Sequence, residues 1–185
     1  MESLTGKLLV AAPSLIDPNF RRTVIIICRH NDDGAMGVVL NRPRGDVHVI
    51  DHLPEWAEHV SSPTCLFIGG PVEPTVGIGL GRPQADGPEP AGLQRVTAAL
   101  GLVDLSEPPS SETPLLDACR IFAGYAGWSP GQLEAEITED AWFVVDSLPG
   151  DAFTPDPEGL WRTVLRRQPG KLAMFAYFPD DPSQN

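Results

Sequence analysis

The chain has 185 residues and carries 13 basic against 25 acidic side chains, a net charge of −12 at pH 7. Its apolar content of 42 % excludes a disordered chain, while 18 glycines and 20 prolines favour many turns and short elements over a helical bundle. We predict a single α+β domain over residues 1–178, followed by a disordered tail at residues 179–185.

The first half of the chain predicts β-strands. Residues 8–11 are short and apolar, and residues 23–29 form an unbroken β-branched run typical of a central strand that is covered on both faces. Asp33 and Gly34 then predict a tight hairpin turn, with residues 36–40 as the returning strand. Further strands are expected at residues 64–68, 75–80, 94–100 and 119–123, and a helix at about residues 53–60 with proline in its first turn.

The second half contains the clearest local signal for a helix start. Ser129, Pro130 and Gln132 stand in the order of a capping box, with the hydroxyl at the N-cap and proline at the first helical position. Leu133 and Ile137 then give this helix an apolar stripe. Residues 142–145 predict a strand that completes a strand–helix–strand unit with residues 119–123, and residues 157–167 predict a last helix.

Cysteine usage and hydropathy predict a cytoplasmic protein without a membrane anchor. Cys28, Cys65 and Cys119 lie in apolar, strand-like segments, which is typical of buried reduced thiols. The longest strongly apolar run, residues 23–28, is far shorter than the roughly 20 residues that span a bilayer. The first residues lack the basic and apolar regions of a signal peptide.

The negative charge is concentrated in the middle of the chain. Residues 45–161 carry three basic and nineteen acidic side chains, so most of this surface repels a polyanion. Because nucleic-acid affinity depends on neutralising phosphates with lysine and arginine, direct nucleic-acid binding is disfavoured. Direct nucleic-acid binding remains a third alternative because of one local group of arginines: Arg21, Arg22, Arg29, Arg42 and Arg44.

A histidine cluster is the first candidate for chemistry. His48, His52 and His59, with Glu55 between them, are residue types that bind zinc or manganese. No HExxH spacing is present, and an acidic surface helix with histidines accounts for the same pattern. We therefore predict no metal.

Glycines and a cysteine supply two further candidates. Glycines at residues 69–70 and 124–127 follow strands and suggest a phosphate cradle, but no complete nucleotide motif is present and tight turns also explain them. Cys28, followed by Arg29, is a candidate nucleophile, although its strand setting favours a core thiol. We predict no tightly held cofactor.

Unusual polar residues stand at the ends of the predicted hairpin strands. Asp17, Asn19 and Arg21 precede the first strand, and Asn41 and Arg42 follow the second. Since the chain runs out and back, the two segments should lie close together. Asp17 can then form an ion pair with Arg21 or Arg42, or all five can form the polar lip of a pocket.

Several segments together resemble the AlgH/YqgE family of bacterial proteins. They are residues 6–13, 17–20, 31–43, 69–72 and 124–137, in the family's order. The resemblance implies a single α+β domain with a bifurcated, partly barrel-like mixed sheet surrounded by helices. Some members carry the label of transcriptional regulator, linked to exopolysaccharide control. This chain shows no helix-turn-helix pattern, which favours a protein or small-molecule partner over direct DNA contact.

We therefore predict a binding or regulatory module rather than an enzyme, with a polar cleft where the hairpin ends meet the turn before the helix near residue 132. The predicted cleft residues are Asp17, Asn19, Arg21, Asn41, Arg42, Tyr125, Trp128 and Gln132. The alternative is a hydrolase for a small phosphorylated or acylated substrate, in which Asp17 or Glu134 acts as base and Arg42 holds the anion.

Overall fold

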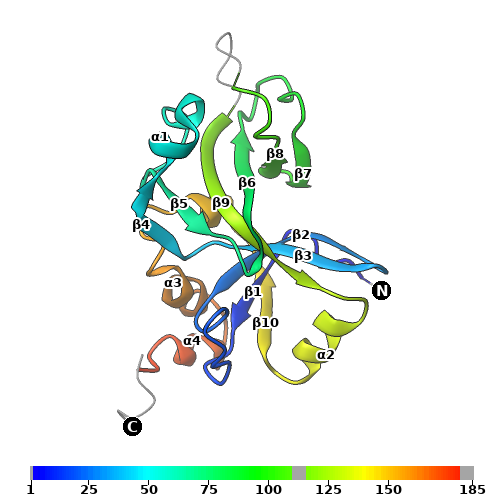
Figure 1. Cartoon of the computed structure of the whole chain (residues 1–185). Helices are drawn as coiled ribbons and strands as arrows, with labels where there is room; N and C mark the ends of the chain where they lie inside the picture. Colours follow the sequence, from blue (N-terminus) through cyan, green and yellow to red (C-terminus); the bar gives the residue numbers. More distant parts are fainter. Residues whose placement is uncertain (1, 110–115, 180–185) are drawn as a thin grey trace.

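A ten-stranded mixed sheet dominates the structure, a computed structural model that describes residues 2–109 and 116–179 (Figure 1). Residues 180–185 of the predicted tail lie outside the described part of the chain. The strands are β1 (Lys7–Ala11), β2 (Val24–Asn31), β3 (Gly34–Val39), β4 (Pro43–His48), β5 (Cys65–Ile68), β6 (Val72–Pro83), β7 (Gln94–Thr97), β8 (Leu100–Val103), β9 (Leu116–Trp128) and β10 (Trp142–Asp146). The helical segments are α1 (Val49–His52), η1 (Pro54–Trp56), α2 (Gln132–Thr138), η2 (Asp151–Phe153), α3 (Leu160–Arg166) and α4 (Leu172–Phe175).

The sheet divides into two branches at β9. The strand order is β10–β1–β2–β3–β9–β6–β8–β7, and β5 also pairs with β9 and carries β4 on its other edge. The end of β9 pairs with β3, whereas Phe122 and Ala123 pair with β5 in parallel. Figure 1 shows β9 curving from one branch into the other. A mixed sheet with short helices agrees with the expected α+β class.

Two finer parts of the fold expectation are not confirmed. The described strands run from β10 to β7 without these two pairing to each other, so a partly barrel-like sheet is not confirmed. Among the described residues, the four α-helices have only four to seven residues each, so a sheet surrounded by helices is not confirmed either. In the described ranges, no helix has the length and apolar character needed to cross a membrane.

Strand β2 is covered on both faces, as its unbroken apolar run predicts. Alternate residues of a strand point to opposite faces of the sheet. Ile26 therefore packs into the cluster that contains Trp161 of α3, whereas Ile25 and Ile27 pack into the cluster that contains Leu133 of α2. The central position of β2 between β1 and β3 confirms this prediction.

Two element predictions are wrong. Instead of one helix at residues 53–60, α1 ends at His52 and only the turn Pro54–Trp56 follows. The residue before a proline is disfavoured from the helical region, and Leu53 accordingly has φ −137° and ψ 68°. Residues 94–100 form two strands instead of one, because a turn at Ala98 and Ala99 lets β7 and β8 pair with each other.

The predicted helix start is formed only in part. Helix α2 begins at Gln132, with Gly131 at its N-cap at φ 76°, so Ser129 is not the cap. The left-handed conformation of Gly131 separates Ser129 from the helix. What remains of the expected box is one hydrogen bond of 3.0 Å, in which the Ser129 backbone N–H donates to Gln132 Oε1.

Candidate functional site

The polar segments at the base of the β2–β3 hairpin lie together, as the sequence predicts. Asn41 Oδ1 accepts a hydrogen bond from the first amide of β2 at 2.9 Å, and Asn41 Nδ2 donates to the Arg22 carbonyl at 2.8 Å. Arg42 donates to the carbonyls of Pro18 at 2.7 Å and Arg21 at 3.1 Å. These bonds hold the loop before β2 against the segment that follows β3.

Within that loop, Asp17 organises its own turn. Its Oδ1 accepts the backbone N–H of Asn19 at 2.8 Å. Burial lowers the pKa of Arg42, and the nearby charge of Asp17 offsets part of that shift. A cavity of about 490 Å³ opens beside the loop. We call it the arginine corner, and it is lined by Pro18, Arg21, Arg22 and Arg42.

The other three predicted cleft residues lie elsewhere. Tyr125 and Trp128 belong to the end of β9, and Gln132 begins α2. Trp128 pairs with Ala35 near the start of β3, whereas Asn41 follows the end of that strand. The eight residues are therefore divided between two places separated by the length of β3. Ligand binding at either place stays a prediction.

Tyr125 and Trp128 border an open groove of about 880 Å³. The groove lies between the β2–β3 hairpin, the β7–β8 hairpin and the end of β9; Figure 1 shows the two hairpins facing each other. Its lining includes Arg29, Asp33, Met36, Arg95, Leu102 and Tyr125. Its volume is in the range of small-molecule sites.

The cations of the groove differ in their partners. Arg95 is held by Glu89 at 2.7 Å and by the Ala98 carbonyl at 2.5 Å. Arg29 is exposed and makes no hydrogen bond or ion pair with the described residues. The Tyr125 hydroxyl donates to Glu73 at 2.9 Å, which raises the pKa of Tyr125, and the charge of Arg29 acts in the opposite direction. Arg29 therefore presents a positive charge beside Tyr125.

Sequence reasoning assigned Arg29 to a possible nucleic-acid patch and left it out of the cleft. One signal was available: after the buried run of β2, exposed Arg29 and Asn31 flank buried His30. This alternation places Arg29 on an open face of the strand. Arg95 had no local signal, because only the packing of the β7–β8 hairpin brings it to the groove.

A carboxylate joins three side chains next to the groove. Glu136 Oε2 accepts the indole N–H groups of Trp128 at 2.9 Å and Trp142 at 2.8 Å. Its other oxygen accepts Gln132 Nε2 at 2.9 Å. Trp128 and Gln132 thus have structural partners that account for their orientation.

We expect Glu136→Ala to lower the free energy of unfolding by about 2–4 kcal/mol, because two buried indole donors lose their acceptor. Glu136→Gln keeps an oxygen that can accept from both indoles, so its free energy of unfolding should fall clearly less. Urea denaturation followed by tryptophan fluorescence measures both values. Equal losses in the two variants would contradict the importance of the shared acceptor oxygen.

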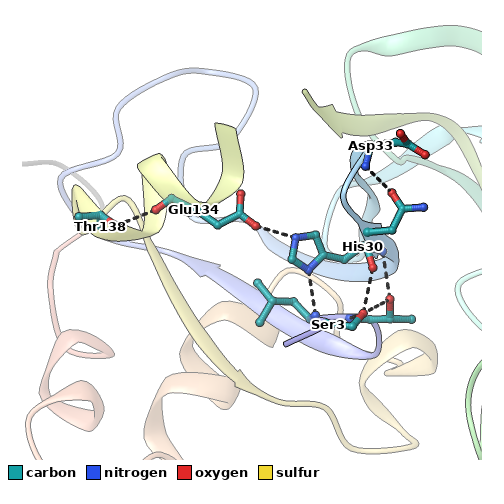
Figure 2. Close-up of polar contacts among 8 residues, drawn as sticks. Ser3, His30, Asp33, Glu134 and Thr138 are labelled. Atoms are coloured by element: carbon teal, nitrogen blue, oxygen red, sulfur yellow. Dashed lines mark hydrogen bonds and ion pairs between the residues drawn. The ribbon is translucent and has the colours of Figure 1, made fainter. Parts of the chain in front are cut away.

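His30 and Glu134 form a second polar contact, between a buried imidazole and a partly exposed carboxylate, shown in Figure 2. His30 Nδ1 accepts the backbone N–H of Leu4 at 3.0 Å, and Nε2 lies 2.7 Å from Glu134 Oε1. Because Nδ1 is an acceptor, Nε2 carries the proton and donates to the carboxylate. A hydrogen bond from its own backbone and the bond to His30 both lower the pKa of Glu134. Both ring nitrogens are therefore used in joining β2 to the N-terminal segment and to α2.

Ser3 does not complete a catalytic triad with this pair. Its hydroxyl donates to the His30 carbonyl at 3.0 Å, and the ring nitrogens have other partners (Figure 2). The His30 side chain is only 3 % exposed. The carboxylate of Glu134, one of the two candidate bases of the hydrolase alternative beside Asp17, is engaged in this contact.

The remaining candidates for chemistry have structural explanations. In the part of the chain that the structure describes, no three His, Cys, Asp or Glu side chains are grouped to hold a metal, so His48, His52 and His59 do not converge. The three cysteines are buried and free, as predicted. Burial raises the pKa of Cys28 to about 12, which agrees with a core thiol.

The two glycine motifs pack against each other. A Cβ on Gly69 would lie 2.2 Å from the Gly124 oxygen, and one on Gly124 would lie 2.6 Å from the Gly70 oxygen. The space around Gly70 is equally small, since an added Cβ would lie 2.1 Å from the Tyr125 carbonyl carbon. These glycines allow close backbone approach next to Tyr125, which supports the structural interpretation over the phosphate cradle.

Comparison with known proteins places the chain in a family. A model of the AlgH-like family matches residues 8–173. A UPF0301 protein of Streptomyces coelicolor is 54 % identical over all of this chain and 97 % of its own length. A UPF0301 protein of Mycobacterium marinum is 45 % identical over 97 % of this chain and 90 % of its own. The chain belongs to the AlgH-like family, which confirms the resemblance seen in its motifs.

Solved structures agree with this assignment. A crystal structure of a Corynebacterium diphtheriae protein superposes with a TM-score of 0.89 and 37 % identity, covering 96 % of this chain and 94 % of that one. The solution structure of the AlgH protein from Pseudomonas aeruginosa gives a TM-score of 0.68 and 28 % identity, covering 97 % and 96 %. The fold is thus shared along almost the whole chain.

Proposed function

We propose that this AlgH-like protein is a binding module that takes a small anionic molecule in the groove beside Tyr125. The observation that carries the proposal is the guanidinium of Arg29, which has no acidic partner in the described chain and lies in a groove of about 880 Å³. An exposed arginine next to a phenol offers charge-assisted hydrogen bonds to a carboxylate or phosphate.

The walls of the groove favour a ligand with an apolar part. Met36, Val72 and Leu102 line it together with the polar groups around Arg29. Sites for small molecules combine an apolar lining with a few polar groups that fix orientation. We therefore expect an organic acid, with its anionic group at Arg29 and its apolar part along Met36 and Leu102.

A regulatory role would act through such a ligand, or through a protein partner, rather than through DNA. The net charge of −12 supports this, because phosphate neutralisation dominates nucleic-acid affinity and most of this surface opposes it. Reduced buried thiols support a cytoplasmic location, and the proposal requires no metal or bound cofactor.

The test is a panel of small organic acids titrated into the isotope-labelled protein, with backbone amide shifts as the readout. We expect saturable shifts at Arg29, Tyr125 and Gly127, and Arg29→Met should weaken binding by about tenfold. The matched control is Arg44→Met, because Arg44 is an exposed arginine paired with Asp46 on β4, outside the groove.

Two results would contradict the proposal. One is a panel without any acid that gives saturable shifts at the groove. The other is an Arg29→Met variant that binds as tightly as the unmodified protein. Duplex DNA is titrated as well, at moderate salt. Saturable DNA binding that Arg29→Met abolishes would also reject the small-molecule assignment.

A further inference from the structure

We infer that the organic acid expected in the groove beside Tyr125 is a short peptide with free termini, about two or three residues long. The inference rests on the function proposed above, because it places the terminal carboxylate of the peptide at Arg29. It adds a second contact, between the terminal ammonium group of the peptide and the carboxylate of Asp33. Both Arg29 and Asp33 line the groove.

Asp33 offers a carboxylate at the turn of the β2–β3 hairpin. Its backbone N–H donates to Asn31 Oδ1 at 3.0 Å, a bond that shapes the turn (Figure 2). Its side chain is exposed and makes no hydrogen bond or ion pair with the described residues. The turn therefore does not use the negative charge of Asp33. This charge is the counterpart of the positive charge that Arg29 carries on the same hairpin.

The turn that carries Asp33 is packed against the wall of the groove. Gly34 follows Asp33 and pairs with Asn31 across the hairpin, with φ 121°. A Cβ on Gly34 would lie 2.2 Å from the backbone oxygen of Trp128, which also lines the groove. Glycine thus allows the turn to approach the end of β9 closely. The position of Asp33 beside the groove follows from this backbone contact.

The charges of the groove favour a ligand with both signs over a simple anion. Among the described residues that line it, Arg29, Asp33 and Arg95 are charged. Arg95 is paired with Glu89, so one guanidinium and one carboxylate are left for a ligand. Glu73 adds a further carboxylate next to the groove. A ligand with only negative charge would be attracted by Arg29 but repelled by these carboxylates, whereas a ligand with an added ammonium group is attracted at both ends.

The spacing of the two charged residues sets the length of the ligand. Two residues of a strand span about 7 Å, which separates Arg29 from Asn31, and Asp33 lies beyond Asn31 in the turn. The side chains of Arg29 and Asp33 do not pair with each other. In a single α-amino acid, one carbon atom joins the two charged groups, which is too short for this spacing. Two or three extended residues cover roughly 7–10 Å between the termini of a peptide.

The walls between the charges suit the middle of a peptide. Met36 is opposite Arg29 in the β2–β3 ladder, so both side chains lie on one face of the hairpin. Leu102 provides an apolar surface on the β7–β8 hairpin. The side-chain amides of Asn31 and Gln94 also line the groove, and amides can donate to and accept from peptide groups. A peptide with an apolar side chain therefore matches the charged, apolar and amide groups of the lining.

The experiment uses one tripeptide, alanine–leucine–alanine, in three forms: with free termini, with an acetylated amino end and with an amidated carboxyl end. Each is titrated into the isotope-labelled full chain at pH 7 and constant ionic strength. We expect saturable shifts of the backbone amides of Arg29, Asp33 and Gly127. Acetylation removes the ammonium charge and should weaken binding about fivefold. Amidation removes the carboxylate and should weaken it about tenfold.

Asp33→Asn tests the assigned contact, since asparagine is also suited to turns. This variant should bind the acetylated peptide at least as tightly as the unmodified protein does, and it should lose the preference for the free amino end. The matched control is Asp32→Asn, because Asp32 is an exposed neighbour that does not line the groove. This control should keep the preference. Arg29→Met should weaken the binding of both peptides and also keep it.

Three outcomes would overturn the inference. They are equal affinity of the unmodified protein for the free and the acetylated peptide, a preference that survives in Asp33→Asn, and free leucine that binds as tightly as the tripeptide. If simple organic acids still bind in a manner that depends on Arg29, only the peptide assignment fails and the function proposed for the groove stands. If neither the acids nor the peptides shift the amides of the groove, both fail.

Discussion

Replacing Gly70 by alanine is expected to lower the free energy of unfolding by at least about 3 kcal/mol, which is a large share of the stability of a domain. A Cβ at this position would lie 2.1 Å from the Tyr125 carbonyl carbon and 2.5 Å from the Ala126 nitrogen. Both neighbours are backbone atoms of β9, the strand that joins the two branches of the sheet. Relief would therefore require β9 to move away from the Gly69–Gly70 segment.

The control is Gly45→Ala, because a Cβ on Gly45 meets no atom within 4 Å. It should change the free energy of unfolding by less than about 0.5 kcal/mol. Urea denaturation followed by circular dichroism compares the two variants. A Gly70→Ala protein as stable as Gly45→Ala would show that the close approach of the two glycine motifs does not matter for the fold.

Arg120→Met is expected to cost about 3–5 kcal/mol, because a buried charged donor is lost and its acceptors remain buried. Arg120 is 1 % exposed, and burial lowers its pKa to about 10, so it stays protonated at neutral pH. Its guanidinium also lies 4.5 Å from the centre of the Phe67 ring. It donates to the carbonyls of Ser62 at 2.6 Å, Ala152 at 3.0 Å and Thr154 at 3.0 Å. The side chain thus ties two loops to β9.

Arg120→Lys is the informative companion variant. An ammonium keeps the charge but cannot reproduce the planar fork that reaches three carbonyls, so an intermediate loss is expected. Arg44→Met, which removes an exposed and paired arginine, should leave the free energy of unfolding almost unchanged. Chemical denaturation of all three proteins measures the differences. If Arg120→Met and Arg44→Met lose the same amount, the role given to Arg120 is wrong.

Elements with a local cause were predicted well. The β-branched run of β2 specified a strand covered on both faces. Asp33 and Gly34 predicted the turn after it, which the structure places one residue earlier, at Asp32 and Asp33, since Gly34 already pairs with Asn31. The helix predicted at residues 53–60 is reduced to the turn Pro54–Trp56, and Pro54 instead ends α1, because it keeps Leu53 out of the helical region. The start of α2 shifted to Gln132 because Gly131 adopts a left-handed conformation, which the capping pattern of Ser129 does not reveal.

Only the part of the candidate sites that has a local cause in the sequence was predicted. Asn41 and Arg42 could be placed beside residues 17–22, because a hairpin necessarily returns the chain to its starting point. The grouping of these residues with Tyr125 and Trp128 in one cleft had no such geometric basis. The structure instead places that pair at the other end of β3, with Arg29 and Arg95 nearby.

Alone, the sequence determined the family, the mixed α+β class, the reduced cysteines and the hairpin with its polar base, since each follows from neighbouring residues or from ordered motifs. Only the tertiary structure decided that the glycine motifs face each other, that β9 branches the sheet and that Arg95 faces the β2–β3 hairpin. These features depend on packing between segments far apart in the chain. Such packing minimises buried voids and unpaired polar groups over the whole molecule, and no short stretch of residues encodes it.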